Sequence, residues 1–377
     1  MPGRDTVDFD HIIVGAGLSG LLLADSLLDT QGVRRLLVVD PRPADDRSVT
    51  YAYWSTRPTI LDRWAVGSWN RLKVVDRRGQ ETSATLNAAR YVAVSWNRAR
   101  AELFGKVSQD SRVTLLQQAV DLVWDGTDCG CVRVGDTVFT GRWVYDSRPP
   151  RLPVGAARGR ATHMVQAFRG IWVRAAGQVI DTRCATLLDF STDDGPDLAF
   201  TYVLPVASQL AMVMAVRMSA SPQMPDPVPA ATRLLGSADW TEVAEESGTT
   251  LLIPSRRRRQ GRHILAIGRR GGRVRASTGY AVTRVLADTE HICLSLRTCG
   301  HPFAIEPDPW WQVILDRIWL QAMTREAAEL EEAFLSLFTR APVDSVVRFL
   351  DGGAGRSDVA AVIRALPPLP FLRALLA

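Results

Sequence analysis

A glycine-rich turn between two apolar segments near the N-terminus constrains the fold of this chain more than any other feature. Residues 8–14 predict a buried strand, and residues 15–20, GAGLSG, match the spacing G-x-G-x-x-G. Residues 21–28 then begin a helix, and residues 35–39 predict a second buried strand that ends at Asp40. A strand, a glycine turn, a helix and a strand in this order predict a dinucleotide-binding unit of the Rossmann type.

Each residue of this turn has a physical role in such a unit. Gly15 permits the sharp turn, Gly17 lets the backbone approach a pyrophosphate, and Gly20 lets the helix pack on the strand. The backbone N–H groups at Leu18 and Ser19 open the helix, where unpaired donors can bind phosphate groups. We therefore predict that all five residues contact a dinucleotide.

Asp40 and a second glycine-rich segment supply further candidate cofactor contacts. Asp40 follows the second predicted strand, where a carboxylate can bind ribose hydroxyls. The second segment reads IGRRGG over residues 267–272 and ASTGY over residues 276–280, and the backbone amides of such turns can line a flavin. The candidate residues in it are Gly268, Gly271, Gly272, Ser277, Thr278 and Gly279. Since a unit of this kind at the N-terminus is typical of FAD-binding proteins, we predict FAD as the cofactor.

Composition narrows the class of protein. No apolar run reaches the roughly 18 residues that a membrane-spanning helix needs, and the first ten residues lack the apolar segment of a signal peptide. We therefore expect a cytoplasmic protein. The net charge of +5 comes with only two lysines and no zinc-finger or RNA-binding signature, so we expect no nucleic-acid partner. The five cysteines form no CxxC pair, and we expect no metal site.

A series of short motifs follows the first glycine turn in a fixed order along most of the chain. They are TYAYW at 50–54, YDSRPP at 145–150, QAFRG at 166–170, LDF at 188–190, FTYVLP at 200–205, the second glycine segment, LFTR at 337–340 and RFL at 348–350. This series resembles the soluble, FAD-dependent lycopene cyclases of bacteria. The resemblance implies a cation-based cyclisation of a polyene that a protonating acid starts, with reduced FAD that is not consumed.

The resemblance also implies the architecture. We expect an α/β protein with the glutathione-reductase-like FAD-binding fold, which combines a Rossmann-type lobe, a β-sheet substrate lobe and a helical C-terminal region. Residues 1–150 and 260–295 are expected to form a discontinuous FAD-binding lobe. Residues 50–100 and 160–260 are expected to form the β-rich substrate lobe, and residues 300–377 a helical C-terminal cap.

One position departs from the family pattern. After the FTYVLP motif the family carries a glutamate on the following strand, in a pattern like L-V-E-x-T, and alignment places Met214 there. A thioether cannot donate a proton, so the acid implied by the resemblance is missing and we expect lycopene to be a poor substrate. Met212 and Met214 are instead predicted to line a polyene-shaped pocket together with Tyr202.

The resemblance points to Asp189, in the LDF motif, as the next candidate acid. Burial between Leu188 and Phe190 would raise its pKa and hold a proton ready for donation. An alternative role is to cap a turn at the end of a strand.

The aromatic motif at 50–54 supplies the other candidate pocket residues. We predict that Tyr51, Tyr53 and Trp54 line the pocket, where each ring would stabilise a carbocation by about 0.5–2 kcal/mol.

A run of arginines suggests a contact outside the active site. Residues 256–259 are four consecutive arginines, with Arg262 close by. A solvated loop is the simpler interpretation. The alternative is a peripheral membrane contact, in which each charge near anionic lipid contributes about 1 kcal/mol.

Together these features predict an FAD-dependent cyclase or isomerase that acts on a hydrophobic polyene without net redox change. The polyene is a carotenoid, a terpenoid or a polyketide derivative. One alternative is a cycloaddition directed by pocket shape. A second is a flavin-dependent monooxygenase, which Gly268-Arg269 disfavours because those enzymes usually carry Gly-Asp there. A third is an inactive relative that binds a polyene or a flavin.

Overall fold

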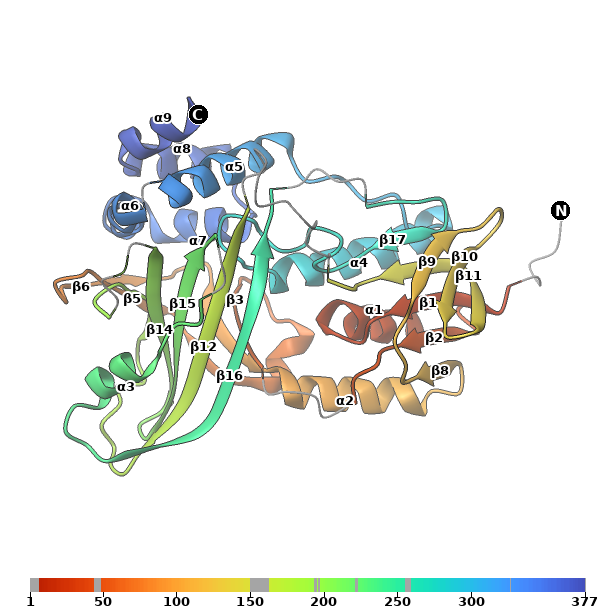
Figure 1. The fold of residues 1–377 in the computed structure, drawn as a ribbon, viewed down its shortest axis with the longest axis horizontal. Helices are drawn as coiled ribbons and strands as arrows, with labels where there is room; N and C mark the ends of the chain where they lie inside the picture. Colours follow the sequence, from red (N-terminus) through yellow and green to blue (C-terminus); the bar gives the residue numbers. More distant parts are fainter. Residues whose placement is uncertain are drawn as a thin grey trace.

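The computed structural model of the chain describes residues 7–43, 49–149, 163–192, 195, 197–220, 223–254, 259–325 and 327–376. Within these ranges the chain forms three β-sheets with helices packed on them. The two larger sheets lie toward opposite ends of an elongated molecule, and the C-terminal helices lie beside the second of them (Figure 1). The mixed α/β class predicted from the sequence is therefore confirmed.

The first sheet contains the strands on either side of the glycine turn. β1 (Phe9–Val14) lies between β2 (Leu36–Val39) and β11 (Thr137–Asp146) and runs parallel to both. The other strands of this sheet are β8 (Val113–Leu116) beside β2, β17 (Ile264–Ala266) and β10 (Gly130–Val134) beside β11, and β9 (Leu122–Asp125) beside β10. The parallel order places the carboxyl ends of β1 and β2 at one edge, so the glycine turn and Asp40 meet there.

Three helices cover one face of the first sheet: α1 (Leu18–Leu28), α2 (Trp96–Gln109) and α4 (Val282–Cys299). They pack on alternate strand residues such as Ile13 and Val38, whereas Ile12 and Leu37 pack on the opposite face. α1 contacts both of the other helices as well as β1, which explains why its sequence is apolar on almost every side.

A buried histidine in β1 makes the stability of this lobe depend on pH. His11 stacks on Tyr145 and its Nδ1 lies 3.1 Å from the Tyr145 hydroxyl. Burial lowers the pKa of His11 from 6.5 to about 4, against an opposing effect of Asp10. Since the unfolded chain takes up this proton near pH 6.5, stability should fall as the pH falls from 6.5 toward 4, by about 3 kcal/mol in all.

Urea denaturation at a series of pH values tests this prediction. The His11→Phe variant cannot take up the proton, so its free energy of unfolding should fall less steeply than that of the wild type over the same interval. Equal pH dependence in the two proteins would show that His11 does not control it.

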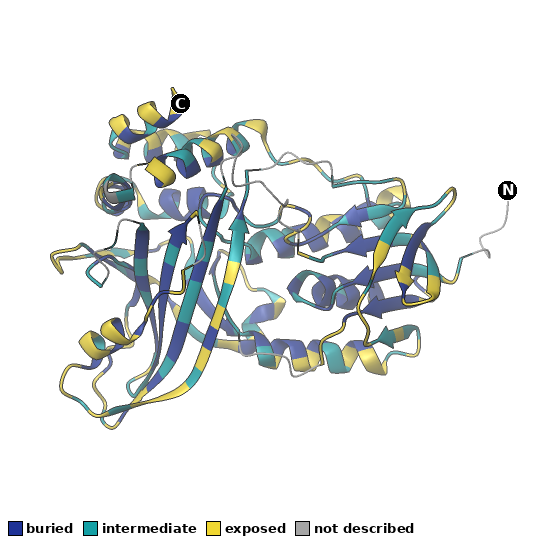
Figure 2. Cartoon of the chain, viewed as in Figure 1, coloured by how far each residue is buried: buried dark blue, intermediate teal, exposed yellow. Residues whose placement is uncertain are grey.

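The second sheet has seven strands in the order β16–β12–β15–β14–β13–β5–β6. They are β16 (Trp240–Leu252), β12 (Met164–Ala175), β15 (Leu210–Ser219), β14 (Leu198–Ala207), β13 (Ala185–Asp189), β5 (Arg71–Val75) and β6 (Glu81–Thr85). β16 lies at one edge and exposes much of its length, whereas the central strands are largely buried (Figure 2).

The two faces of the second sheet carry different neighbours. The inner face includes Tyr202 and Met214 and belongs to the same apolar cluster as the C-terminal helices. The outer face includes Val203 and Val213 and is covered by α3 (Val228–Leu235). Since successive strand residues point to opposite faces, the register decides which side chains reach the inner face.

A third, three-stranded sheet lies between the two lobes in the order β3–β7–β4. Its strands are β3 (Thr50–Ser55), β7 (Arg90–Ser95) and β4 (Ala65–Trp69). Along β3, Ala52 and Trp54 pack with the inner face of the second sheet, whereas Tyr51 and Tyr53 pack with the helices of the first sheet. This strand therefore joins the two apolar cores.

Five helices follow at the C-terminal end: α5 (Trp310–Arg325), α6 (Ala327–Arg340), α7 (Val343–Asp351), α8 (Arg356–Ala365) and α9 (Pro368–Leu375). They bury Trp319 against Phe334, Phe349 and Phe371 and close the inner face of the second sheet. In the part of the chain that the structure describes, no helix has the length and apolar character needed to cross a bilayer.

Candidate flavin and substrate site

The glycine turn has the geometry that the fingerprint predicts. Gly15 has a φ of +100°, its N–H donates to the Val39 carbonyl at 2.8 Å, and a Cβ there would overlap the Ser147 hydroxyl. A Cβ at Gly20 would overlap the Gly15 carbonyl oxygen, because α1 crosses the end of β1 closely. At Gly17 the nearest atom to such a Cβ is Arg42 Nη2 at 3.6 Å, which is an ordinary contact.

The start of α1 fits the phosphates of a dinucleotide. Gly17 is the N-cap residue and has no side chain to accept from the first N–H groups, and the first turn carries no acidic residue. Leu18 and Ser19, both predicted to contact the cofactor, open the helix here. Backbone donors without a capping side chain, at the positive end of a helix, are suited to bind an anion.

Asp40 lies at the predicted place, but Arg42 donates hydrogen bonds to its carboxylate oxygens. Its carboxylate accepts hydrogen bonds from the Ala16 backbone at 2.5 Å and from the Arg42 backbone and guanidinium at 2.8–3.0 Å. Burial opposes ionisation, yet the hydrogen bonds and charge of Arg42 hold the pKa of Asp40 below its usual value. To bind ribose hydroxyls, Asp40 must release part of Arg42, whose side chain is half exposed.

Sequence reasoning missed two arginines at this turn. Arg42 reaches over Gly17, and Arg100 of α2 is buried with its Nε 3.4 Å from the Ala16 carbonyl and its Nη1 on the Pro43 carbonyl. Both place positive charge beside the N-terminus of α1. The available signal for Arg42 was its position two residues after Asp40, whereas nothing in the helical segment of Arg100 distinguishes it from the many other arginines.

The second glycine segment packs directly on the first. A Cβ at Gly268, whose φ is +55°, would overlap the Ser19 hydroxyl, and the Ile267 N–H donates to the Asp146 carbonyl at 3.0 Å. Gly271 and Gly272 close this turn, with their N–H groups donating to carbonyls within the turn at 3.0 and 3.2 Å. The structure thus brings the two predicted cofactor segments together, although they lie about 250 residues apart.

The second half of this segment binds mainly to the C-terminal helices. The Ser277 hydroxyl donates to Asp316 at 2.8 Å, and the Thr278 hydroxyl donates to the Leu350 carbonyl at 3.0 Å. A Cβ at Gly279 would overlap the Gln166 side chain of β12. The side chains of Ser277 and Thr278 are therefore engaged by protein, and only backbone groups of this stretch remain as candidate flavin contacts.

An aromatic cluster connects the second glycine segment to the inner face. Trp54 lies 4.5 Å from Tyr91 and 5.8 Å from Tyr280 between ring centroids. Burial raises the pKa of Tyr91 to about 12, and burial also raises the pKa of Tyr202 and Tyr280 well above the usual value. Since Tyr280 ends the second glycine segment, this cluster of neutral rings lies next to the predicted flavin position.

The predicted pocket residues of β3 divide between the two sides of the strand. Trp54 belongs to the aromatic cluster. Tyr53 packs in the core of the first lobe, with its hydroxyl 2.8 Å from the Thr59 hydroxyl. Tyr51 packs edge-on against Trp96 of α2. Because adjacent strand residues face opposite ways, Tyr53 and Tyr51 do not share the face that Trp54 lines.

Tyr202, Met212 and Met214 all reach the inner face. Cross-strand pairing places Tyr202 opposite Met214 and Leu204 opposite Met212. Both methionines are fully buried in the cluster that includes the C-terminal helices. The structure therefore brings these three predicted pocket residues together.

Asp189 lies on the other side of the sheet. It pairs with Thr201, which neighbours Tyr202 on β14 and so faces away from it. Its carboxylate accepts from the backbone N–H of Ser191 at 2.9 Å and from the Ser191 hydroxyl, and Arg233 of α3 lies 4.0 Å away. The prediction that Asp189 donates a proton to the substrate is not supported by this position; the alternative, turn capping, describes its contacts.

Sequence reasoning also missed a buried carboxyl on the inner face. Glu246 of β16 is 4% exposed, in a strand whose other residues are largely open to solvent. It accepts hydrogen bonds from the Thr50 N–H at 2.6 Å, the Thr50 hydroxyl at 2.8 Å and Trp172 Nε1 at 3.2 Å. Burial raises the pKa of Glu246, against the effect of these hydrogen bonds.

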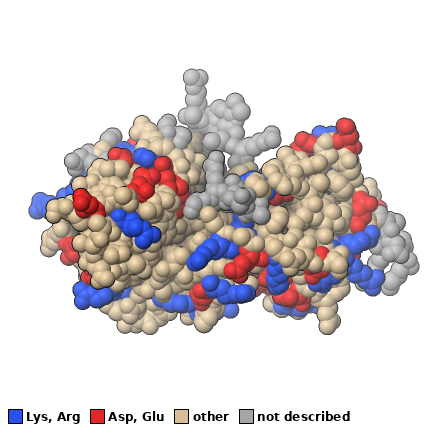
Figure 3. Space-filling model, turned by 90° about the horizontal axis from the view of Figure 1, so that it is seen from below, with Lys and Arg blue, Asp and Glu red and all other residues tan. Residues whose placement is uncertain are grey.

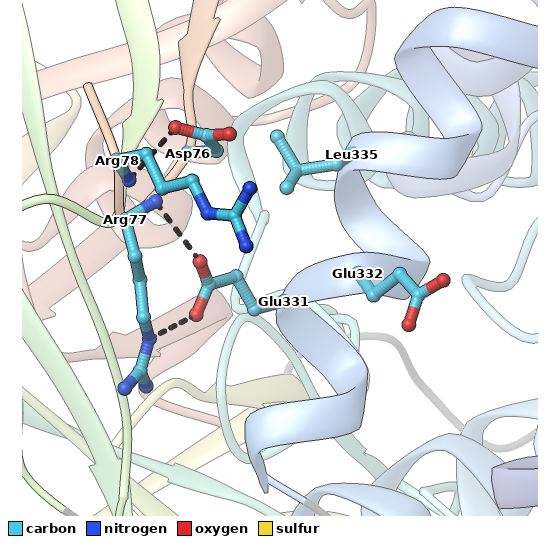
Figure 4. Close-up of a pocket in the computed structure, with 6 residues that line it drawn as sticks. All are labelled: Asp76, Arg77, Arg78, Glu331, Glu332 and Leu335. Atoms are coloured by element: carbon cyan, nitrogen blue, oxygen red, sulfur yellow. Dashed lines mark hydrogen bonds and ion pairs between the residues drawn. The ribbon is translucent and has the colours of Figure 1, made fainter. Parts of the chain in front are cut away.

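A surface cavity of about 300 Å³ lies away from both glycine segments, between the turn after β5 and α6 (Figure 4). Five of its six lining residues are charged, and Glu331 accepts from the Arg77 backbone at 3.2 Å and from its guanidinium. A cavity lined by ion-paired side chains does not fit a polyene. No group of three metal-binding side chains occurs among the described residues.

Of the arginine run, residues 256–258 lie outside the described residues. Arg259 forms a two-bond ion pair with Asp288 of α4 at 2.7 and 2.8 Å and is largely buried. On the face seen in Figure 3, basic and acidic side chains are intermixed. Arg259 is therefore not free to bind lipid. Membrane contact stays a prediction that depends on the other arginines of the run.

Solved flavoproteins share this fold. A flavoprotein/dehydrogenase from Cytophaga hutchinsonii matches with a TM-score of 0.61 and 10% identity over 98% of both chains. The flavin-dependent brominase Bmp2 matches with a TM-score of 0.58 and 12% identity over 95% of this chain and 98% of its own. At such identities the likeness shows the fold alone. The chain thus has the fold of these flavoproteins, an α/β arrangement with a Rossmann-type lobe and a second β-sheet lobe, as predicted.

The family model described as "Lycopene cyclase protein" matches residues 10–376, nearly the whole sequence. The chain belongs to the lycopene cyclase family, which confirms the resemblance drawn from its motifs. No curated protein matches the sequence at a significant level.

Proposed function

We propose that this chain is an enzyme that binds FAD at the two glycine segments and cyclises or isomerises a hydrophobic polyene without net redox change. The observation that carries the proposal is the position of Tyr280. It ends the second glycine segment and packs with Trp54 in the cluster that continues to Tyr202 and Met214. A flavin held by the glycine segments would lie beside this apolar, aromatic surface in a member of the lycopene cyclase family.

The residues present fit the cofactor. The uncapped start of α1, the small side-chain volume at Gly17 and the nearby Arg42 and Arg100 suit a pyrophosphate. Bound FAD in its reduced form would supply an electron-rich ring beside the substrate.

The chain's own aromatic residues would then stabilise positive charge. The rings of Trp54 and Tyr91 are buried and that of Tyr280 is partly buried. All three are neutral, and each attracts a nearby carbocation by about 0.5–2 kcal/mol. Met212 and Met214 supply adaptable, water-excluding surface for a long apolar chain. Such a lining favours a polyene over a polar substrate.

The substrate class follows from Met214. The family's acid is absent from this position, so we propose that lycopene is a poor substrate and that a different carotenoid, a terpenoid or a polyketide-derived polyene is preferred. A cycloaddition directed by pocket shape is the second candidate, and Met214 favours it because that reaction requires no acid on β15. Flavin-dependent monooxygenation and polyene binding without turnover are the remaining alternatives.

The purified protein should be incubated anaerobically with photoreduced FAD and a panel of acyclic polyenes that includes lycopene. We expect a cyclised product to form while the flavin spectrum ends in its reduced form. Product that appears only with NADPH and oxygen would indicate a monooxygenase. Polyene binding without any product would indicate the non-catalytic relative.

A further inference from the structure

We propose that Glu246 is the acid of this site and that it replaces, from a neighbouring strand, the carboxyl that is missing at Met214. This inference rests on the proposed function, since it assigns the proton donor for the cyclisation. In that step the O–H bond of Glu246 breaks as its proton adds to a polyene C=C, and the ring C–C bond forms at the resulting cation. The cation then loses a proton from a C–H bond to the Glu246 carboxylate, so the acid is restored and the formula of the substrate is unchanged. The inference is carried by the cross-strand register of the second sheet, by the burial of Glu246 and by the neutral groups around it.

The register places both positions in one row across the inner face. Met214 of β15 pairs with Gly170 of β12, and Gly170 pairs with Glu246 of β16. Tyr202 continues the row on the other side of Met214. Directly paired residues point to the same face, and neighbouring strands lie about 5 Å apart. Glu246 therefore faces the same space as Met214, two strands away.

The residue between them is a glycine, and this removes the obstacle between the two side chains. A Cβ at Gly170 would lie 2.7 Å from Cε and 3.1 Å from Sδ of Met214, so the methionine side chain extends over Gly170 toward β16. A glutamate at position 214 with the same orientation would put its carboxyl over Gly170. Glu246 lies on the strand next to Gly170, and its carboxylate is held by Thr50 of β3 and Trp172 of β12.

Burial raises the pKa of Glu246 and so favours its protonated form, whereas the hydrogen bonds from Thr50 and Trp172 favour the ionised form. The groups that face it are Thr50 of β3 and Trp172 of β12, by hydrogen bonds, with Tyr202 of β14 and Tyr51 of β3 close enough for electrostatic coupling. All of them are neutral near pH 7. The Thr50 hydroxyl can reverse its hydrogen bond when the carboxyl gains a proton, because a hydroxyl both donates and accepts.

A second buried carboxyl, Asp351 at the end of α7, is the competing candidate. Burial raises its pKa to about 6, but Arg284 and Arg275 oppose this rise by favouring the ionised form. No cation is among the groups that set the pKa of Glu246. Glu246 also lies in the row of Met214, whereas Asp351 lies on a C-terminal helix.

The matched control is the adjacent glutamate. Glu245 lies on the same strand but faces the outer side, is solvent-exposed and pairs with Arg169 at 2.7 Å. This ion pair lowers the pKa of Glu245. Glu245→Gln should therefore change neither the proton inventory at neutral pH nor turnover.

Infrared spectroscopy of the purified flavoprotein tests the protonation of Glu246 without any substrate. In a pH titration, the carboxylic-acid C=O band that remains above the range of exposed carboxyls should lose intensity in Glu246→Gln but not in Glu245→Gln. Asp351→Asn identifies the separate contribution of Asp351, whose pKa burial raises to about 6. If Glu246→Gln leaves this band unchanged, Glu246 is ionised and the proposal is wrong.

Measuring turnover distinguishes two roles for Glu246, a catalytic acid or a residue that only links β16 to β3. With whichever polyene the wild type cyclises, Glu246→Gln should lower kcat about 10²–10⁴-fold with FAD content unchanged. Glu246→Asp should retain more activity than Glu246→Gln, because it keeps the acid. A structural role predicts the reverse, since glutamine preserves length and most hydrogen bonds. Cyclisation by Glu246→Gln at the wild-type rate would overturn this proposal alone; absence of cyclisation in the wild type would overturn the proposed function.

Discussion

The Gly17→Val variant should purify as a folded protein without flavin. Gly17 has an extended backbone, with φ −84° and ψ −168°, that valine can adopt, and its Cβ would make only an ordinary contact with Arg42. The branched side chain would nevertheless stand at the N-terminus of α1, where the pyrophosphate must approach the backbone. We expect full loss of the flavin absorbance of the purified protein, with a cost of about 1 kcal/mol in stability from the poorer N-cap.

Gly20→Ala is the matched control, because it acts on the fold rather than on the ligand. Its Cβ would overlap the Gly15 carbonyl oxygen, so α1 must shift from β1 at a cost of about 1–3 kcal/mol. The thermal melting temperature should fall more in Gly20→Ala than in Gly17→Val. A Gly17→Val protein that keeps the full flavin absorbance would show that the cofactor does not bind at this turn.

Loss of Asp316 should produce the largest decrease in stability. Asp316 of α5 accepts from Arg275 Nε at 3.1 Å and from the Ser277 hydroxyl at 2.8 Å, and the Arg275 side chain is 1% exposed. Burial lowers the pKa of Arg275, yet the guanidinium also stacks over Phe349 and stays charged. The Asp316→Ala variant leaves this charge buried without its partner, which costs about 3–5 kcal/mol.

Urea denaturation measures this cost, and an exposed ion pair provides the control. Asp181 pairs with Arg183 at 2.8 Å, but both side chains are more than half exposed. Asp181→Ala should therefore change the free energy of unfolding far less than Asp316→Ala does. Equal effects of Asp316→Ala and Asp181→Ala would show that the Arg275–Asp316 pair does not hold the C-terminal helices to the second glycine segment.

The first lobe was predictable because its signal is local. The strand expected at residues 8–14 is Phe9–Val14, the one expected at 35–39 is Leu36–Val39, and the glycine turn lies between the first strand and α1. Turn geometry and helix packing depend on residues within one short segment, so spacing alone reveals them. The contact of Gly268 with Ser19 is long-range, and the two segments were assigned to one lobe only because nucleotide-binding folds are often discontinuous in sequence.

The substrate site was less predictable because it depends on the faces of strands. Asp189 and Tyr202 lie in adjacent family motifs, yet the register of β13 and β14 puts them on opposite sides of the sheet. The alternation along β3 similarly separates Tyr53 from Trp54. A resemblance in sequence indicates which segments matter, but the direction of each side chain follows from pairing with distant strands.

Glu246 is the converse case, a candidate site residue that the sequence did not reveal. Its strand reads as polar and exposed, and the edge position in the second sheet agrees with this. The glutamate is buried because Thr50, 196 residues earlier in the sequence, packs over it. Sequence spacing carries no sign of that contact.

The mass of the product formed in heavy water tests the central claim most directly. A redox-neutral cyclisation started by a protein acid predicts a product with the elemental formula of its substrate in ordinary water. In D₂O each ring should carry one deuterium delivered by the exchanged acid. Products that contain added oxygen, or that differ from the substrate by two hydrogens, would contradict the account and assign the chain to flavin redox chemistry.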